Sequence, residues 1–165
     1  MPTFLVRTIA QLTLLLCLAT TVSAAQLGQS LIPFKGTDLK GEQYDLQQSI
    51  GTKPIMLIFW ASWCPTCKTE VPKINKLAEK YQQLGMEFVA VNVGFNDTVE
   101  RALAFVQQTG MTYRAYFDGS GTIAEKYRLQ GVPTVIIADR QGIVRFRNFT
   151  TPDITDAHFA QLSAQ

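Results

Sequence analysis

The sequence contains few of the residues that build metal centres or charge-driven binding surfaces. Its 165 residues include one histidine and three cysteines, which makes a four-ligand zinc site within one chain nearly impossible. The 15 lysines and arginines almost balance the 13 aspartates and glutamates, so the net charge is only +2, and no basic run occurs. A nucleic-acid binder led by charge is therefore excluded. With 47% hydrophobic residues and no repeats, the chain is suited to one compact domain.

Residues 1–25 have the features of a secretory signal peptide. A short, positively charged start is followed by the apolar stretch 8–22, and VSAA at 22–25 offers the small residues that a signal peptidase reads. The apolar stretch is shorter than the ~20 residues of a spanning helix and contains Gln11, so we expect cleavage rather than retention as a membrane anchor. The domain 26–165 is therefore expected to work in the periplasm or another extracytoplasmic compartment, where disulfides persist.

Segments with strand-like and helix-like spacing alternate along the rest of the chain. We expect a hairpin around residues 38–41, strands at 54–60, 87–93, 115–117, 134–138 and 143–149, and helices at 65–84, 98–108, 120–127 and 153–162. Buried strands that alternate with helices indicate an α/β fold with a central sheet. The last two strands are joined by a short turn and should pair antiparallel, so the sheet is expected to be mixed. In the second helix, we expect Val99, Leu103 and Val106 to face the core.

Two cysteines occupy a position typical of a redox site, in the WCPTC segment at residues 63–67. The segment follows a predicted buried strand and opens a predicted helix. Cys64 falls at the helix N-terminus, where free backbone N–H groups and the helix dipole favour a thiolate. Pro65 suits the first turn because it has no N–H to leave unpaired. Cys64 is therefore expected to be the exposed nucleophile, and Cys67 the more buried thiol that resolves the mixed disulfide.

Other interpretations of this cysteine pair are a structural disulfide or half of a metal site. A structural disulfide stabilises most when it closes a long loop, whereas this one would close almost nothing. A metal site would need further ligands, and the only other candidate, His158, lies in the last predicted helix. The spacing and the position of the pair therefore favour redox activity.

The segment FWASWCPTCKTEVP at residues 59–72 resembles the active site of the thioredoxin superfamily, in particular that of its extracytoplasmic TlpA/ResA-like branch. The resemblance covers roughly residues 31–149. It includes DLKG at 38–41, VAVNVG at 89–94 and GVPT at 131–134. It implies an α/β, thioredoxin-like fold in which helices flank a central mixed sheet, with an N-terminal β-hairpin and a central βα insertion over residues 95–118.

The resemblance also implies a substrate-binding surface beside the cysteines. Pro133 matches the cis-proline of the family, whose loop packs against the CxxC, although only about 5–6% of X–Pro bonds are cis. Because Pro133 has no N–H, the backbone of Val132 beside it can be offered to an extended substrate. Trp63 and Pro65 border Cys64 and are expected to form part of the docking surface. The alternative for Pro133 is an ordinary trans proline at the start of a strand.

Glu70 stands three residues after Cys67, where the TlpA/ResA-like branch has a glutamate. Residues three apart on a helix share a face, so the two side chains are expected to lie together. A partly buried carboxyl with a raised pKa could accept the proton of Cys67 as that thiol attacks. The alternative is a solvated acid, which is favoured in the first turn of a helix.

The resemblance implies an enzyme, a thiol-disulfide oxidoreductase that reduces protein disulfides outside the cytoplasm. Members of this branch commonly serve cytochrome c maturation, and others reduce metallochaperones, so the resemblance implies apocytochrome c or a metallochaperone as the substrate. Because the compartment is oxidising, a reductase there needs electrons from a membrane protein with a thiol pair of its own. We expect a monomer that uses no cofactor beyond the Cys64–Cys67 disulfide and binds no metal and no nucleic acid.

Three other functions compete with this one. A disulfide oxidase or isomerase would use the same site, and the residues between the cysteines, Pro65 and Thr66, do not decide the direction of electron flow. A non-enzymatic copper- or haem-handling chaperone would need additional histidine or methionine ligands near the CxxC, and no such residue is well placed. A peroxidase that resembles peroxiredoxins would carry a threonine three residues before the reactive cysteine, where this chain has Ala61.

Overall fold

The computed structural model describes residues 25–164, so the expected signal peptide lies outside the described residues except for Ala25. The strands are β1 (Lys35–Thr37), β2 (Gln43–Asp45), β3 (Ile55–Trp60), β4 (Glu87–Asn92), β5 (Arg114–Phe117), β6 (Thr134–Ala138) and β7 (Val144–Asn148). The helices are α1 (Pro65–Tyr81), α2 (Val99–Thr109), α3 (Thr122–Lys126) and α4 (Asp156–Ala164), with a short 3₁₀ helix at Leu46–Gln48. Between residues 25 and 164, none of the helices combines the length and the hydropathy of a transmembrane segment.

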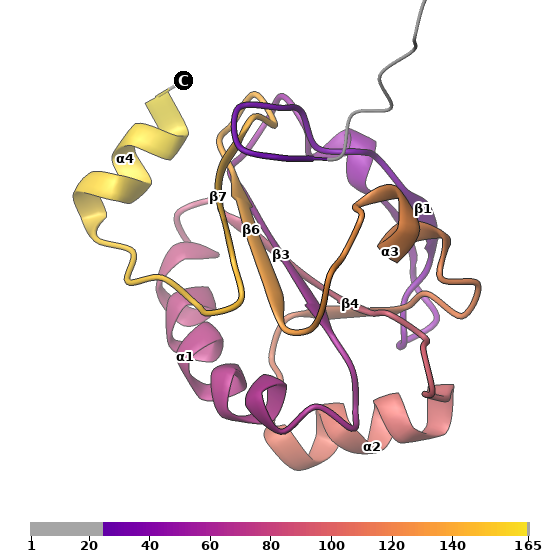
Figure 1. Cartoon of the computed structure of the whole chain (residues 1–165). Coiled ribbons are helices and arrows are strands. Elements are labelled where there is room, and N and C mark those ends of the chain that lie inside the picture. Colours follow the sequence, from indigo (N-terminus) through magenta and orange to yellow (C-terminus); the bar gives the residue numbers. More distant parts are fainter. Residues whose placement is uncertain (1–24, 165) are drawn as a thin grey trace, which may run out of the picture.

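One five-stranded mixed sheet, in the order β5-β4-β3-β6-β7, forms the centre of the domain. β3 pairs parallel with β4 and antiparallel with β6, and β6 and β7 pair antiparallel, as expected. All residues of β3 and β6 are buried, which explains why β3 is a continuous apolar run in the sequence and why β6 is apolar after Thr134. α1 and α4 lie on one side of the sheet, and α3 and the β1–β2 hairpin lie on the other (Figure 1). The expected α/β architecture is confirmed.

Residues 61–64 form a short connection between β3 and α1. Ile74, Ala78 and Tyr81 of α1 are buried on one face of the helix. Pro65 occupies the first turn, where the absence of its N–H leaves no hydrogen bond unmade. The connection therefore puts the free N–H groups of α1 at the end of the central strand, where the cysteine pair lies.

The expected inward face of α2 is wrong in part. Val99 and Leu103 are 41% and 43% exposed, whereas Phe105 is buried and Val106 packs against the core. The ring of Phe105 stacks on the ring of Trp60 at the end of β3, with 4.6 Å between the centroids. An aromatic ring removes more apolar surface from water than a valine or a leucine does. The helix therefore packs through Phe105 and leaves the smaller side chains outside.

The residues before the N-terminal hairpin pair with the last strand of the sheet and the turn that precedes it. The N–H of Gly28 donates to the carbonyl of Val144, and the N–H of Leu31 donates to the carbonyl of Gly142, both at 2.8 Å. This segment therefore runs beside β7, and the hairpin strand β1 starts only at Lys35. The turn at 38–41 lies between β1 and β2, as the sequence predicts.

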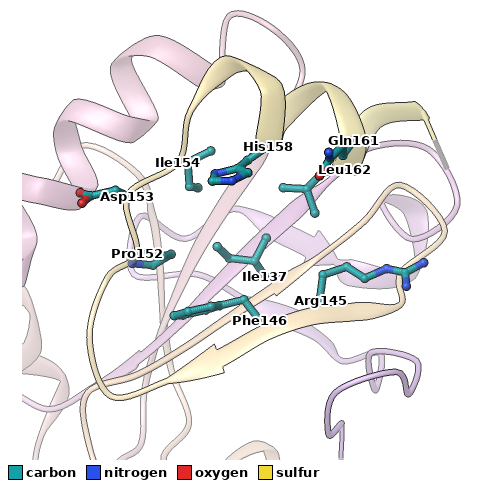
Figure 2. Close-up of a pocket in the computed structure, with 9 residues that line it drawn as sticks. All are labelled: Ile137, Arg145, Phe146, Pro152, Asp153, Ile154, His158, Gln161 and Leu162. Atoms are coloured by element: carbon teal, nitrogen blue, oxygen red, sulfur yellow. The ribbon is translucent and has the colours of Figure 1, made fainter.

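α4 is packed loosely, and none of its residues is buried. The ring of Phe159 stacks on Tyr81 of α1 with 5.0 Å between the centroids, and the hydroxyl of Tyr81 donates to the carbonyl of Ile154 at 2.8 Å. The sequence predicts that the last helix begins at residue 153, but α4 begins only at Asp156. The carbonyl of Ile154, before the helix, instead accepts the hydrogen bond from Tyr81. A cavity of about 350 Å³ remains between α4 and the last two strands, with Phe146 on the sheet side (Figure 2).

Gly94 and Gly110 offer a matched test of how tightly the loop after β4 packs. Both have a left-handed backbone, with φ of 68° and 64°, and an alanine costs about 1–2 kcal/mol in this conformation. A Cβ on Gly94 would lie 2.2 Å from the carbonyl oxygen of Asp118, whereas nothing lies within 4 Å of one on Gly110. In urea denaturation, Gly94→Ala should therefore lose at least about 1 kcal/mol more free energy of unfolding than Gly110→Ala. Equal losses would mean that the loop can move away from Asp118.

Candidate active site

A disulfide joins Cys64 and Cys67 at the first turn of α1, with their Cα atoms 5.2 Å apart. Cys64 is the N-cap of the helix, and the backbone N–H of Cys67 donates to its sulfur at 3.1 Å. This N–H and the helix dipole would stabilise a negative charge on Cys64 once the disulfide is reduced. Each cysteine is 4% exposed, so the expected difference in burial is not found in the oxidised state, where the disulfide holds both sulfurs against one helical turn.

The peptide bond between Val132 and Pro133 is cis, as the resemblance implies. The carbonyl oxygen of Val132 lies 3.6 Å from the sulfur of Cys64. The loop before β6 therefore packs against the cysteine pair, although the two segments are 68 residues apart in the chain. Gly131 is exposed, Val132 is half-buried and Pro133 is buried.

Trp63 and Pro65, the residues on either side of Cys64, are exposed. The side chain of Trp63 is held in place, because its Nε1–H donates to the carbonyl of Phe95 at 2.8 Å. Phe95 belongs to the loop after β4 and is itself 67% exposed. The structure thus places the backbone of Val132 against the sulfur of Cys64, which Trp63 and Pro65 flank in the chain.

Glu70 is buried on the same helix as Cys67, and its carboxylate is held at both oxygens. One oxygen accepts a hydrogen bond from the ammonium of Lys73 at 2.7 Å, and the other accepts from the backbone N–H of Thr151 at 2.8 Å. Burial raises the pKa of Glu70, but these hydrogen bonds lower it by more, so the net shift is downward. The expected raised pKa is therefore wrong. The alternative of a solvated acid is wrong as well, because Glu70 is 4% exposed.

Sequence analysis does not identify Asp97, whose carboxylate contacts the segment before the cysteine pair. It accepts hydrogen bonds from the backbone N–H and the hydroxyl of Ser62, both at 2.6 Å. In the sequence, Asp97 stands directly before Thr98, the N-cap of α2, so an ordinary capping pattern conceals it. Thr151 is missed for another reason: it contributes a backbone N–H, which any residue except proline can offer.

The arrangement of these residues meets the requirements for thiol-disulfide exchange with a partner. One sulfur lies at a helix N-terminus, a second lies one turn away, and the residues that flank the first are exposed. Two electrons can be stored reversibly in the bond between Cys64 and Cys67. Among residues 25–164, no group of three or more His, Cys, Asp or Glu side chains is placed to hold a metal ion.

Comparison with known proteins reveals relatives over most of the chain. Residues 27–147 match the model of the AhpC/TSA family. The thiol-disulfide oxidoreductase ResA of Geobacillus kaustophilus (strain HTA426) is 33% identical over 127 residues, which cover 76% of this chain and 71% of that protein. The thiol:disulfide interchange protein DsbE of Tatumella citrea is 32% identical over 132 residues, which cover 78% of this chain and 68% of that protein.

Solved structures are similar as well. The structure of MTB DsbF in its mixed oxidised and reduced forms matches with a TM-score of 0.65 and 26% identity, over 85% of this chain and 96% of that chain. A thiol:disulfide interchange protein of the thioredoxin family from Chlorobium tepidum TLS shares the fold, with a TM-score of 0.67 at 20% identity over 83% of this chain and 94% of that chain. The chain belongs to the AhpC/TSA family, and within it to the thioredoxin-like thiol-disulfide oxidoreductases of the ResA and DsbE type.

Proposed function

We propose that this protein reduces disulfide bonds of other proteins in an extracytoplasmic compartment, with Cys64 as the nucleophile and Cys67 as the resolving thiol. The observation that carries the proposal is the Cys64–Cys67 disulfide at the start of α1, against the backbone of Val132 and beside the exposed Trp63. The likeness to ResA and DsbE supports exchange with a protein disulfide.

In the reductive cycle, the thiolate of Cys64 attacks one sulfur of the substrate disulfide. The other substrate sulfur leaves as a thiolate and takes up a proton, and a mixed disulfide now joins Cys64 to the substrate. The thiolate of Cys67 then attacks the sulfur of Cys64, which releases the second substrate thiol and forms the Cys64–Cys67 disulfide. Two electrons have passed to the substrate, so a dithiol donor must reduce the pair before the next cycle.

Four residues around Cys64 form the proposed substrate-binding surface. An extended segment of substrate can hydrogen-bond to the backbone of Val132 in the manner of an added strand, and Pro133 contributes no N–H that would need another partner. The exposed faces of Trp63 and Pro65 border the same sulfur. They would contact the side chains that flank the substrate cysteine.

We assign the proton acceptor role for Cys67 to Glu70 from its burial and its place one turn along α1. The lowered pKa keeps Glu70 ionised at neutral pH, and the ionised carboxylate is the form that can accept a proton. The same low pKa makes it a weak base, so its contribution belongs at the lower end of general-base catalysis. The bond to Thr151 adds a structural task, because it holds the segment before α4 against α1.

The proposal extends to location and partners. Residues 1–25 would direct the domain 26–165 across the membrane and then be removed. By the resemblance of its active-site segment to the TlpA/ResA-like branch, the substrate would be apocytochrome c or a metallochaperone. The reductant would be a membrane protein with its own thiol pair, since the compartment itself is oxidising.

Serine variants of the two cysteines test the assignment of roles. With dithiothreitol as the electron donor, the wild-type protein should accelerate the reduction of insulin. Cys64→Ser should not accelerate it, because no nucleophile remains at the helix N-terminus. Cys67→Ser should accumulate mixed disulfides with insulin, visible on non-reducing gels, because nothing resolves them. Turnover that persists in Cys64→Ser, or Cys67→Ser that stays free of adducts, would contradict the mechanism.

Replacing Glu70 by glutamine should destabilise the protein at neutral pH. Folding lowers the pKa of Glu70 from 4.5, so its carboxylate stabilises the folded state above pH ~4.5, and this contribution is lost as the pH falls through the lower folded-state pKa. The difference in free energy of unfolding between wild type and Glu70→Gln should therefore be about 1–3 kcal/mol at pH 7 and shrink in acid. Urea denaturation at a series of pH values measures it.

The same variant tests the proton acceptor role, with Glu79→Gln as the matched control because Glu79 is exposed on the same helix. Insulin reduction should slow by up to roughly 100-fold in Glu70→Gln and stay at the wild-type rate in Glu79→Gln. If the pH–rate profiles of Glu70→Gln and wild type coincide, Glu70 has only its structural task.

A further inference from the structure

Asp97 is a buried carboxylate that the proposed mechanism does not use. It lies in the loop after β4, and its side chain has no exposed surface. Its oxygens accept hydrogen bonds from the N–H and the hydroxyl of Ser62 at 2.6 Å each, from the side-chain amide of Asn92 at 2.7 Å and from the N–H of Thr98 at 3.0 Å. Burial raises the pKa of Asp97, but hydrogen bonds lower it by more, so it stays ionised at neutral pH.

The donors around Asp97 come from three parts of the fold. Ser62 lies in the connection between β3 and α1, Asn92 ends β4, and Thr98 is the N-cap of α2. A guanidinium nitrogen of Arg101, from α2, lies 3.8 Å from the carboxylate. Asp97 therefore joins the start of α2 to the segment that precedes the cysteine pair.

A second contact joins the same two segments one residue further along the chain. Trp63 donates its Nε1–H to the carbonyl of Phe95 at 2.8 Å. Ser62 and Trp63, the two residues before Cys64, are thus both bound to the loop at residues 94–97. Trp63 and Phe95 expose 43% and 67% of their surface beside the active site. The position of this loop therefore decides how the aromatic side chains are presented next to the reactive sulfur.

We infer that Asp97 is a positioning residue for thiol-disulfide exchange with protein substrates, acting through Ser62 and Trp63. The inference rests on the proposed function, because it concerns how a protein disulfide docks at Cys64. A protein substrate must contact the residues around the sulfur, whereas a small disulfide need only reach the sulfur itself. Loss of Asp97 should therefore slow the reaction with a protein more than the reaction with a small molecule.

Asp97→Asn tests this role with insulin and bis(2-hydroxyethyl) disulfide as the two substrates. Asparagine has one acceptor oxygen, so its NH₂ group must face donors that the second carboxylate oxygen served. We expect kcat/KM for insulin to fall by about tenfold or more, and kcat/KM for the small disulfide to fall by less than about threefold. Iodide quenching of the exposed Trp63 should also change, while Trp60, at 1% exposure, is shielded from iodide.

Asp139→Asn is the matched control. Asp139 is also fully buried and accepts N–H bonds from Gln141 and Ile143, both at 2.9 Å. It follows β6 at the end of the sheet opposite the cysteine pair. This variant should lose stability but keep the wild-type ratio of the two kcat/KM values. If Asp97→Asn keeps the wild-type ratio of the two kcat/KM values, as it would when both values fall by the same factor, the inference is overturned.

Ser62→Ala keeps the test decisive if Asp97→Asn does not fold. It removes only the hydroxyl bond to Asp97 and retains the backbone one, so we expect kcat/KM for insulin to fall by about threefold and the small-disulfide value to fall less. A ratio equal to that of the wild type contradicts the role of Asp97. A wild-type protein that does not reduce insulin contradicts the proposed function instead, so the two failures are distinguishable.

Discussion

The active site depends on one junction, at which the buried strand β3 passes through residues 61–64 into the N-terminus of α1. β3 is paired on both edges and buried along its whole length, so the start of α1 is held at a defined point of the sheet. The free N–H groups and the dipole of α1 then act on Cys64, its N-cap. The loop that carries Val132 leads into β6, which pairs with the same strand. The sulfur of Cys64 and the backbone of Val132 beside it are therefore positioned by one sheet.

Two buried carboxylates hold the two ends of this junction. On the side before Cys64, Asp97 binds Ser62 to the loop after β4. On the side after the cysteines, Glu70 binds the N–H of Thr151, ahead of α4. Hydrogen bonds lower the pKa of both acids by more than burial raises it, so both are ionised at neutral pH. The segment between them is thus pre-organised, which reduces the cost of ordering it when a partner docks.

The sequence predicts those features that depend on local patterns. A continuous apolar run identifies β3 because this strand is buried on both faces, and the spacing of Cys64 and Cys67 identifies the redox pair. Local patterns do not predict features that depend on contacts between residues far apart in the chain. The inward face of α2 is decided by the stacking of Phe105 on β3. The lowered pKa of Glu70 depends on the hydrogen bond from Lys73 in the same helix and also on Thr151, which is 81 residues away.

The redox state of the protein in its native compartment tests the central claim, reduction of protein disulfides, most directly. Cells would be quenched with acid, free thiols alkylated, and the protein weighed by mass spectrometry. The account predicts that Cys64 and Cys67 are both alkylated, because a membrane donor keeps them reduced, and that the mass lacks residues 1–25. A protein found with the Cys64–Cys67 disulfide intact, in cells whose donor is active, would contradict a reductase and favour an oxidase.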